Sequence, residues 1–151
     1  GVKHTSLNLY QFERLLSKTG TQGYYGHDEQ FLSALALQPY GFIGSTIGIM
    51  PHVYRNIAAA LAAGDFAAAR NGQAMANDVI DALMAVGVLP GVKAILAMDG
   101  VDCGQCRAPL GQPSPEQINL LKRVMTPVWQ ARNDSEQSTD AAPPRREKIA
   151  S

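Results

Sequence analysis

Gly1-Val2-Lys3-His4-Thr5-Ser6 opens the chain and places one lysine in a short apolar, β-branched run. The run predicts a buried strand with Lys3 near its carboxyl end. A desolvated lysine loses part of its proton affinity and becomes a usable amine nucleophile. The alternative is an edge or terminal lysine whose ammonium group reaches water. The rest of the chain has to distinguish these two interpretations.

Two further glycine-bounded apolar runs follow, Gly23-Tyr24-Tyr25-Gly26 and Gly41-Phe42-Ile43-Gly44. Helical patterns separate the three runs, and Ser6 and Gly20 are expected to cap the two ends of the first helix. Alternation of strand and helix predicts a parallel α/β sheet. The apolar stripes of the two helices are Leu9, Phe12, Leu15 and Leu16, then Phe31, Leu32, Leu35 and Ala36.

Beyond the third run the pattern is helical. Gly64-Asp65 should end one helix and cap the next, which should stop at Gly87. Ser114-Pro115-Glu116-Gln117 has the form of a capping box that opens a last helix, and Pro127 is expected to kink or break it. His52, in a first helical turn, is expected at the surface.

The predicted sheet is too small to stand as a complete parallel sheet, because such sheets need both faces and both edges covered. A barrel of eight strand–helix units runs to roughly 250 residues. We therefore expect the carboxyl-terminal portion of a TIM (β/α)8 barrel, although a small open sheet of another kind remains an alternative. Residues 1–50 would hold the last three units, residues 51–132 the final barrel helix and a helical region, and residues 133–151 a disordered tail.

The composition is that of a soluble globular domain, with 46% hydrophobic and 17% charged residues. A formal net charge of zero gives no indication of nucleic acid or of an anionic membrane surface. No apolar run has the length of a membrane span, and the first residues lack the layout of a secretory signal. A cytoplasmic location is therefore expected.

Polar residues follow all three predicted strands: Lys3-His4-Thr5-Ser6, His27-Asp28-Glu29 and Ser45-Thr46. Functional groups of parallel α/β proteins collect beyond the carboxyl ends of the strands, so these residues predict one site. The alternative for the second and third groups is a helix start, where Asp, Glu, Ser and Thr are common. The third run is also a weak phosphate-loop candidate, because it lacks the lysine of that motif.

The three strand ends, together with Ile49-Met50, resemble the last three barrel strands of the class I pyruvate aldolases, the family of dihydrodipicolinate synthase and N-acetylneuraminate lyase. Val88-Leu89-Pro90-Gly91-Val92-Lys93 and Cys106-Arg107-Ala108-Pro109-Leu110-Gly111 resemble the helical region of the same family. The resemblance covers residues 1 to about 132.

This resemblance implies that Lys3 forms a Schiff base with the ketone carbon of pyruvate or of the bound keto acid. A protonated imine withdraws electrons, so an adjacent carbon–carbon bond can break or form. No metal and no other cofactor is implied. Five positions match those that hold the polyhydroxylated sugar portion of the substrate: Thr5, Gly26, Asp28, Glu29 and Ser45.

The Asp28-Glu29 pair favours a sugar acid as the substrate. The implied reaction is reversible cleavage of N-acetylneuraminate to N-acetylmannosamine and pyruvate, ahead of the dihydrodipicolinate synthase reaction or another keto-acid aldol reaction. The family also implies a homotetramer. Its catalytic tyrosine and carboxylate-binding loop belong to earlier strands, so this chain is expected to be inactive by itself.

Two function classes outside the family remain open. One is a non-catalytic helical interaction module formed by residues 51–132. The other is a redox or metal protein that uses Cys103-Gly104-Gln105-Cys106. A lone C-x-x-C lacks the second ligand pair of a zinc site, so two ordinary loop thiols are favoured.

Overall fold

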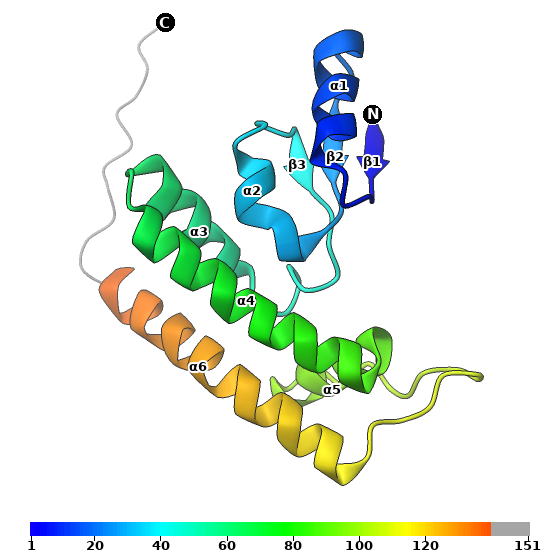
Figure 1. Cartoon of the computed structure of the whole chain (residues 1–151). Helices are drawn as coiled ribbons and strands as arrows, with labels where there is room; N and C mark the ends of the chain where they lie inside the picture. Colours follow the sequence, from blue (N-terminus) through cyan, green and yellow to red (C-terminus); the bar gives the residue numbers. More distant parts are fainter. Residues whose placement is uncertain (140–151) are drawn as a thin grey trace, which may run out of the picture.

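The computed structural model describes residues 1–139. A small sheet with its connecting helices lies beside an assembly of longer helices (Figure 1). The elements, in chain order, are β1 (Val2–His4), α1 (Leu9–Thr19), β2 (Gly23–Tyr25), the 3₁₀ helix η1 (Asp28–Gln30), α2 (Phe31–Leu35), β3 (Gly41–Phe42), α3 (Pro51–Ala62), α4 (Phe66–Val86), α5 (Val88–Met98) and α6 (Pro115–Thr139).

The three strands pair in parallel in the order β1-β2-β3. Lys3 is opposite Tyr24, and Tyr25 is opposite both His4 and Phe42. The connection from β1 to β2 contains α1, and that from β2 to β3 contains η1 and α2. The predicted parallel arrangement of these strands is confirmed, and their carboxyl ends lie at one edge of the sheet.

The beginning of α1 differs from the prediction. Asn8, not Ser6, is the N-cap, and its Oδ1 accepts a hydrogen bond of 3.1 Å from the amide of Gln11. Ser6 Oγ instead accepts from the amide of Asn8 at 3.2 Å, so it stabilises the approach to the helix. The other end is as predicted, because Gly20 adopts a left-handed conformation with φ of 60°.

Side-chain caps organise the helical region as the sequence predicts. Asp65 Oδ1 accepts from the amide of Ala68 at 2.9 Å and caps α4, which ends at Gly87. At the start of α6 the Ser114 amide donates to Gln117 Oε1 at 2.8 Å, and the Gln117 amide donates to Ser114 Oγ at 3.3 Å. This reciprocal pair confirms the capping box.

The last helix is longer than predicted. It continues through Pro127, where a kink or a break was expected, so the proline does not end the helix; the nearby Met125 and Val128 are fully buried and hold the backbone in place. It also reaches Thr139, inside the range 133–151 that was predicted as a disordered tail. No Gly or Pro occurs in residues 128–139 to end the helix. Residues 140–151 of the predicted tail lie outside the described residues.

The main core lies between the long helices and includes Ile57, Leu83 and Met125, each almost completely buried. His52 is part of this interior, so its predicted surface position is wrong. Its side chain is 4% exposed, and its Nε2 donates to the carbonyl of Val128 at 2.9 Å. This bond lets α3 bury a polar ring against α6.

A second, smaller cluster lies under the sheet. Phe12, Tyr25 and Ala34 are each 0% exposed and join α1 and α2 to β2. Phe31 and Phe42 connect the sheet part to the helices, since the Phe31 ring lies 4.1 Å from that of Phe42 and 4.8 Å from that of Tyr54. The strand ends are therefore attached to the helical region through aromatic contacts.

The helices α4 and α5 meet at Gly87 with a bend of 117°. Within residues 1–139 no single helix is long and apolar enough to cross a membrane, and this bent pair alone passes by length and composition. Their buried side chains, among them Val79, Leu83 and Ile95, belong to the main core.

Candidate functional site

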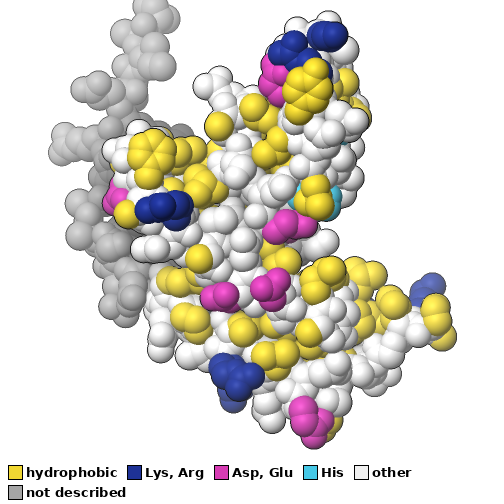
Figure 2. Space-filling model, viewed as in Figure 1, with side chains coloured by type: hydrophobic (Ala, Val, Ile, Leu, Met, Phe, Trp, Pro, Cys, Tyr) yellow, Lys and Arg dark blue, Asp and Glu magenta, His cyan; other side chains and the backbone are white. Residues whose placement is uncertain are grey.

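A pocket of about 280 Å³ lies where the carboxyl ends of the strands meet the helical region. We call it the strand-end pocket. An indentation beside acidic and hydrophobic side chains separates the sheet part from the helices in Figure 2. All five predicted substrate contacts line the pocket. Its polar lining is Thr5, Gly26, His27, Asp28, Glu29, Ser45 and Thr46, and its apolar lining is Ile80, Leu83, Met84 and Val88.

Lys3 lies next to the strand-end pocket, beside Gly26. A Cβ atom on Gly26 would come within 2.9 Å of Lys3 Cε and closer still to Thr5 Oγ1. Gly26 therefore leaves room for the lysine stem and the threonine hydroxyl to lie over the end of β2. The Gly26 amide also donates to the carbonyl of His4 at 3.0 Å, which fixes the two strand ends together.

The predicted desolvation of Lys3 is not present in this structure. Its side chain is exposed on one face of β1, which forms an edge of the sheet among the described residues. His4, the next residue, points to the opposite face and stacks on Phe12 with ring centroids 5.1 Å apart. Because successive side chains of a strand point to opposite faces, Lys3 lies on the solvent-exposed face of β1 and His4 lies on the face that packs against Phe12.

Asp28 is the buried carboxylate of the strand-end pocket, with 6% of its surface exposed. Its Oδ2 accepts from the Thr46 amide at 2.9 Å and from Thr46 Oγ1 at 2.6 Å. Tyr54 Oη lies 2.6 Å from Thr46 Oγ1, and since the threonine proton already points to Asp28, Tyr54 is the donor of this bond. Burial raises the pKa of Tyr54 above its usual value, so the phenol keeps its proton.

The Asp28 carboxylate leaves no space for a side chain at position 44, where the chain has glycine. A Cβ atom at this position would overlap Asp28 Oδ1. The loop from β3 to α3 can therefore close over Asp28 only with glycine at position 44. Together, Gly44 and Thr46 place Ser45 at the rim of the pocket.

His27 and Glu29 form a side-chain hydrogen-bond contact next to this carboxylate. His27 Nδ1 lies 2.7 Å from Glu29 Oε1, with 23% and 40% of the two side chains exposed. Both residues are therefore accessible to a molecule in the pocket. Below them, the Tyr25 hydroxyl donates to the Ser6 carbonyl at 3.0 Å and is also bonded to the Gln30 side chain. Burial raises the pKa of Tyr25, as does the nearby charge of Glu29.

Sequence reasoning missed Gln73, which reaches the site from α4. Its Nε2 donates to the Asp28 carbonyl at 3.1 Å, and its Oε1 accepts from the Leu32 amide at 2.8 Å. These partners are 45 and 41 residues away along the chain. No local spacing signals such contacts, because they arise only when α4 packs against η1 and α2.

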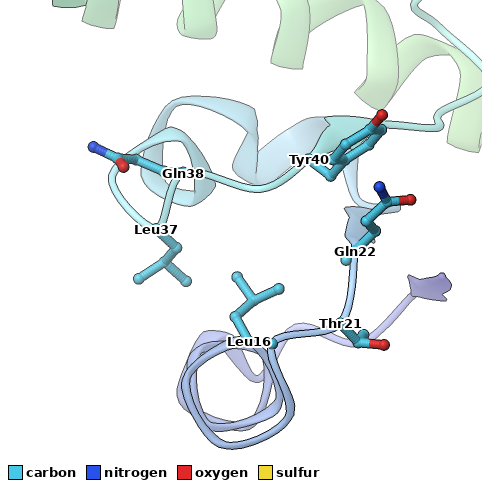
Figure 3. A pocket seen from close by; sticks show the side chains of 8 residues that line it. Leu16, Thr21, Gln22, Leu37, Gln38 and Tyr40 are labelled. Atoms are coloured by element: carbon cyan, nitrogen blue, oxygen red, sulfur yellow. The ribbon is translucent and has the colours of Figure 1, made fainter.

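A second cavity, of about 360 Å³, lies at the opposite, amino-terminal end of the strands. Figure 3 shows Leu16 from α1 and Leu37 from the turn after α2 facing each other across it, with Gln22 and Tyr40 on the other side. None of the residues that were predicted for the site lines it.

The C-x-x-C segment remains apart from these cavities. Cys103 and Cys106 are free thiols in a loop whose carbonyls at Cys103 and Gln105 accept from Lys93 Nζ at 2.9 and 3.2 Å. Within residues 1–139 no group of three or more His, Cys, Asp or Glu side chains could hold a metal ion. Lys93 thus stabilises the conformation of this loop by bonding to the backbone carbonyls of the loop.

Comparison with known proteins decides the family. The model of the dihydrodipicolinate synthetase family matches residues 1–127. The chain belongs to the dihydrodipicolinate synthetase family. Among the curated members it is 36% identical over 129 residues to N-acetylneuraminate lyase of Rhizobium meliloti (strain 1021), covering 85% of this chain and 43% of that protein. It is 38% identical over 133 residues to N-acetylneuraminate lyase of Escherichia coli (strain K12 / DH10B), covering 87% and 45%.

Solved structures of the dihydrodipicolinate synthetase family have the same architecture. N-acetylneuraminate lyase from Fusobacterium nucleatum superimposes with a TM-score of 0.77 at 31% identity, covering 85% of this chain and 44% of that one. The sialic acid aldolase of Ruminococcus gnavus gives 0.80 at 27% identity, with 89% and 46% covered. The fold is therefore part of a TIM barrel, and the chain spans less than half the length of these family members.

Proposed function

We propose that this chain is the carboxyl-terminal portion of a class I pyruvate aldolase, comprising the last three strand–helix units of its barrel and the helical region that follows. The proposed reaction is reversible cleavage of N-acetylneuraminate to N-acetylmannosamine and pyruvate. The observation that carries this proposal is the strand-end pocket, where all five predicted sugar contacts line one cavity beside Lys3. The named lyases among the relatives support the same reaction.

Lys3 is the proposed nucleophile. Its neutral amine adds to the ketone carbon of the substrate, and loss of water gives a protonated imine. The bond between the two carbons beyond the imine carbon then breaks as the hydroxyl group on the farther carbon gives its proton to a base of the remaining barrel strands. The electron pair of that bond moves toward the imine, which releases the sugar aldehyde and leaves an enamine of pyruvate. Protonation of the enamine carbon and addition of water then release pyruvate and restore the lysine.

The other polar groups of the strand-end pocket bind the sugar portion in this proposal. Glu29, Ser45 and Thr5 offer a carboxylate and two hydroxyls, which suit a polyhydroxylated substrate. A site that pairs substrate hydroxyls rejects analogues that lack them. Gly26 provides the close approach between Lys3 and Thr5. Asp28 both lines the pocket and holds the Ser45–Thr46 loop.

The full-length protein would supply the remaining barrel strands, which cover the exposed edge at β1 and desolvate Lys3. We further propose that it is a homotetramer, as the family resemblance implies, and that it is cytoplasmic, as the sequence pattern predicts. Without those strands, the chain of residues 1–151 would bind substrate weakly and have no activity.

Reduction with borohydride in the presence of pyruvate tests the nucleophile in the full-length protein. Mass spectrometry should find the reduced adduct on Lys3, and the adduct should disappear in Lys3→Arg but persist in Lys18→Arg, which changes an exposed lysine on α1. Labelling of another residue, or none, contradicts the proposal. If Lys3 is labelled but N-acetylneuraminate is not cleaved, the substrate assignment is wrong and another keto-acid aldolase is indicated.

A further inference from the structure

Gln73 lies on α4, behind the turn that carries Asp28 and Glu29. We propose that Gln73 is a positioning residue that holds this turn, and with it the Glu29 carboxylate, in place for the sugar portion of the substrate. The inference rests on the proposed aldolase function and extends it to a residue outside the strand ends.

The side-chain amide of Gln73 is bonded on both sides of Glu29. Its Nε2 donates to the carbonyl of Asp28, the residue before Glu29, at 3.1 Å. Its Oε1 accepts from the amide of Leu32, in the first turn of α2, at 2.8 Å. An amide in a first helical turn has no partner within its own helix, so the glutamine satisfies a group that would otherwise need water or a cap.

The orientation of this amide is itself fixed. Asn77, one turn further along α4, accepts from Gln73 Nε2 through its Oδ1 at 2.9 Å. The nitrogen therefore faces Asp28 and Asn77, while the oxygen faces Leu32. Residues Ala69 and Ala76 on α4 are 0% exposed in the main core, so the helix that presents the glutamine is firmly packed.

The other described hydrogen bonds near Glu29 do not fix its backbone to the helical core, so its position depends on the Gln73 bonds. Its described side-chain partner is His27, two residues away on the same segment, so that bond moves with the segment. The Thr46 bonds hold the side chain of Asp28 rather than the backbone of the turn. Beside the ring contacts of Phe31, Gln73 adds direct hydrogen bonds from α4 to the backbone on both sides of Glu29.

The test compares Gln73→Leu with Gln73→Glu and with Asn71→Leu in the full-length enzyme. Gln73→Leu keeps a similar volume but loses both bonds, so kcat/KM for N-acetylneuraminate should fall about tenfold, mainly through KM. The rate of pyruvate trapping at Lys3 should change less than about twofold, because pyruvate does not need Glu29. Gln73→Glu keeps the acceptor for Leu32 but loses the donor to the Asp28 carbonyl, so KM should rise in this variant as well.

Asn71→Leu is the matched control, since Asn71 is an exposed amide on the same helix, and both rates should remain unchanged. If wild-type enzyme traps no pyruvate, the proposed function and this inference both fail. If wild type traps pyruvate but Gln73→Leu leaves KM unchanged, only this inference fails. Equal losses in trapping and in sugar-acid cleavage would show a merely structural role and would also overturn it.

Discussion

The sheet part, residues 1–50, and the helical part, residues 51–139, divide chemistry and stability between them. The sheet part contains every residue that was predicted for the site, but its own cluster of fully buried side chains is small. The helical part contributes most of the main core and the apolar wall of the strand-end pocket. The comparison teaches that the site depends on helices that carry none of its predicted catalytic groups.

The largest expected effect comes from the core of the helical part. Met125→Ala removes a side chain that is 0% exposed and should lower the free energy of unfolding by about 2–5 kcal/mol. Met84→Ala is the matched control, because Met84 is 70% exposed, and should change it by less than about 0.5 kcal/mol. Denaturant unfolding followed by circular dichroism measures both. If the two variants lose the same free energy of unfolding, burial of Met125 in the helical part does not contribute to the stability of the chain.

A smaller, local effect is expected where the sheet part closes over Asp28. Gly44→Ala adds a Cβ that overlaps Asp28 Oδ1, so the carboxylate must move and its bonds to Thr46 should break, at a cost of about 1–3 kcal/mol. Hydrogen exchange at the Thr46 amide should become faster. Gly48→Ala, in the same loop with nothing within 4 Å of its Cβ, should leave that exchange unchanged. Unchanged exchange in Gly44→Ala would contradict the proposed packing.

The smallest effect should come from an ion pair at the surface of the helical part. Asp99 accepts from Arg132 Nη1 and Nη2 at 2.7 and 2.8 Å, and this hydrogen bonding holds the pKa of Asp99 below its usual value of 3.8. Because the folded-state pKa is lowered, the contribution is present above the unfolded pKa and is lost as the pH falls through the folded pKa. Both side chains are about one third exposed, so we expect less than about 1 kcal/mol.

Urea unfolding of Asp99→Asn against wild type checks this difference. The variant should be less stable at neutral pH and indistinguishable from wild type in strong acid. Asp81→Asn, which changes an exposed carboxyl group on α4, is the control. A stability difference for Asp99→Asn that persists unchanged in strong acid would show that the carboxylate charge is not its cause.

Local sequence patterns predicted the parts of the fold that local forces determine. The glycine-bounded runs became three parallel strands, and Gly20, Asp65 and the Ser114 capping box mark helix ends as expected. Polar residues after each strand came together because parallel strands end at one edge. The caps depend on neighbours within a few residues, and the strand pairing follows from the repeated order of strand and helix.

Features that depend on distant packing were missed or wrong. His52 was expected at the surface because its local pattern does not show that the Val128 carbonyl, 76 residues away, would accept its proton. Of the kink or break expected at Pro127, the break does not occur, because buried neighbours outweigh the lost backbone bond. The expected desolvation of Lys3 depends on atoms beside β1 that the described chain does not supply.

The edge position of β1 has a practical consequence for handling this chain. Among the described residues β1 pairs only with β2, so the backbone N–H and C=O groups on its outer side face solvent. An exposed strand edge with Val2 at the surface is a template for another strand. Concentrated solutions of this chain are therefore expected to self-associate through β1, and the same edge is where the remaining strands of the proposed barrel would pair.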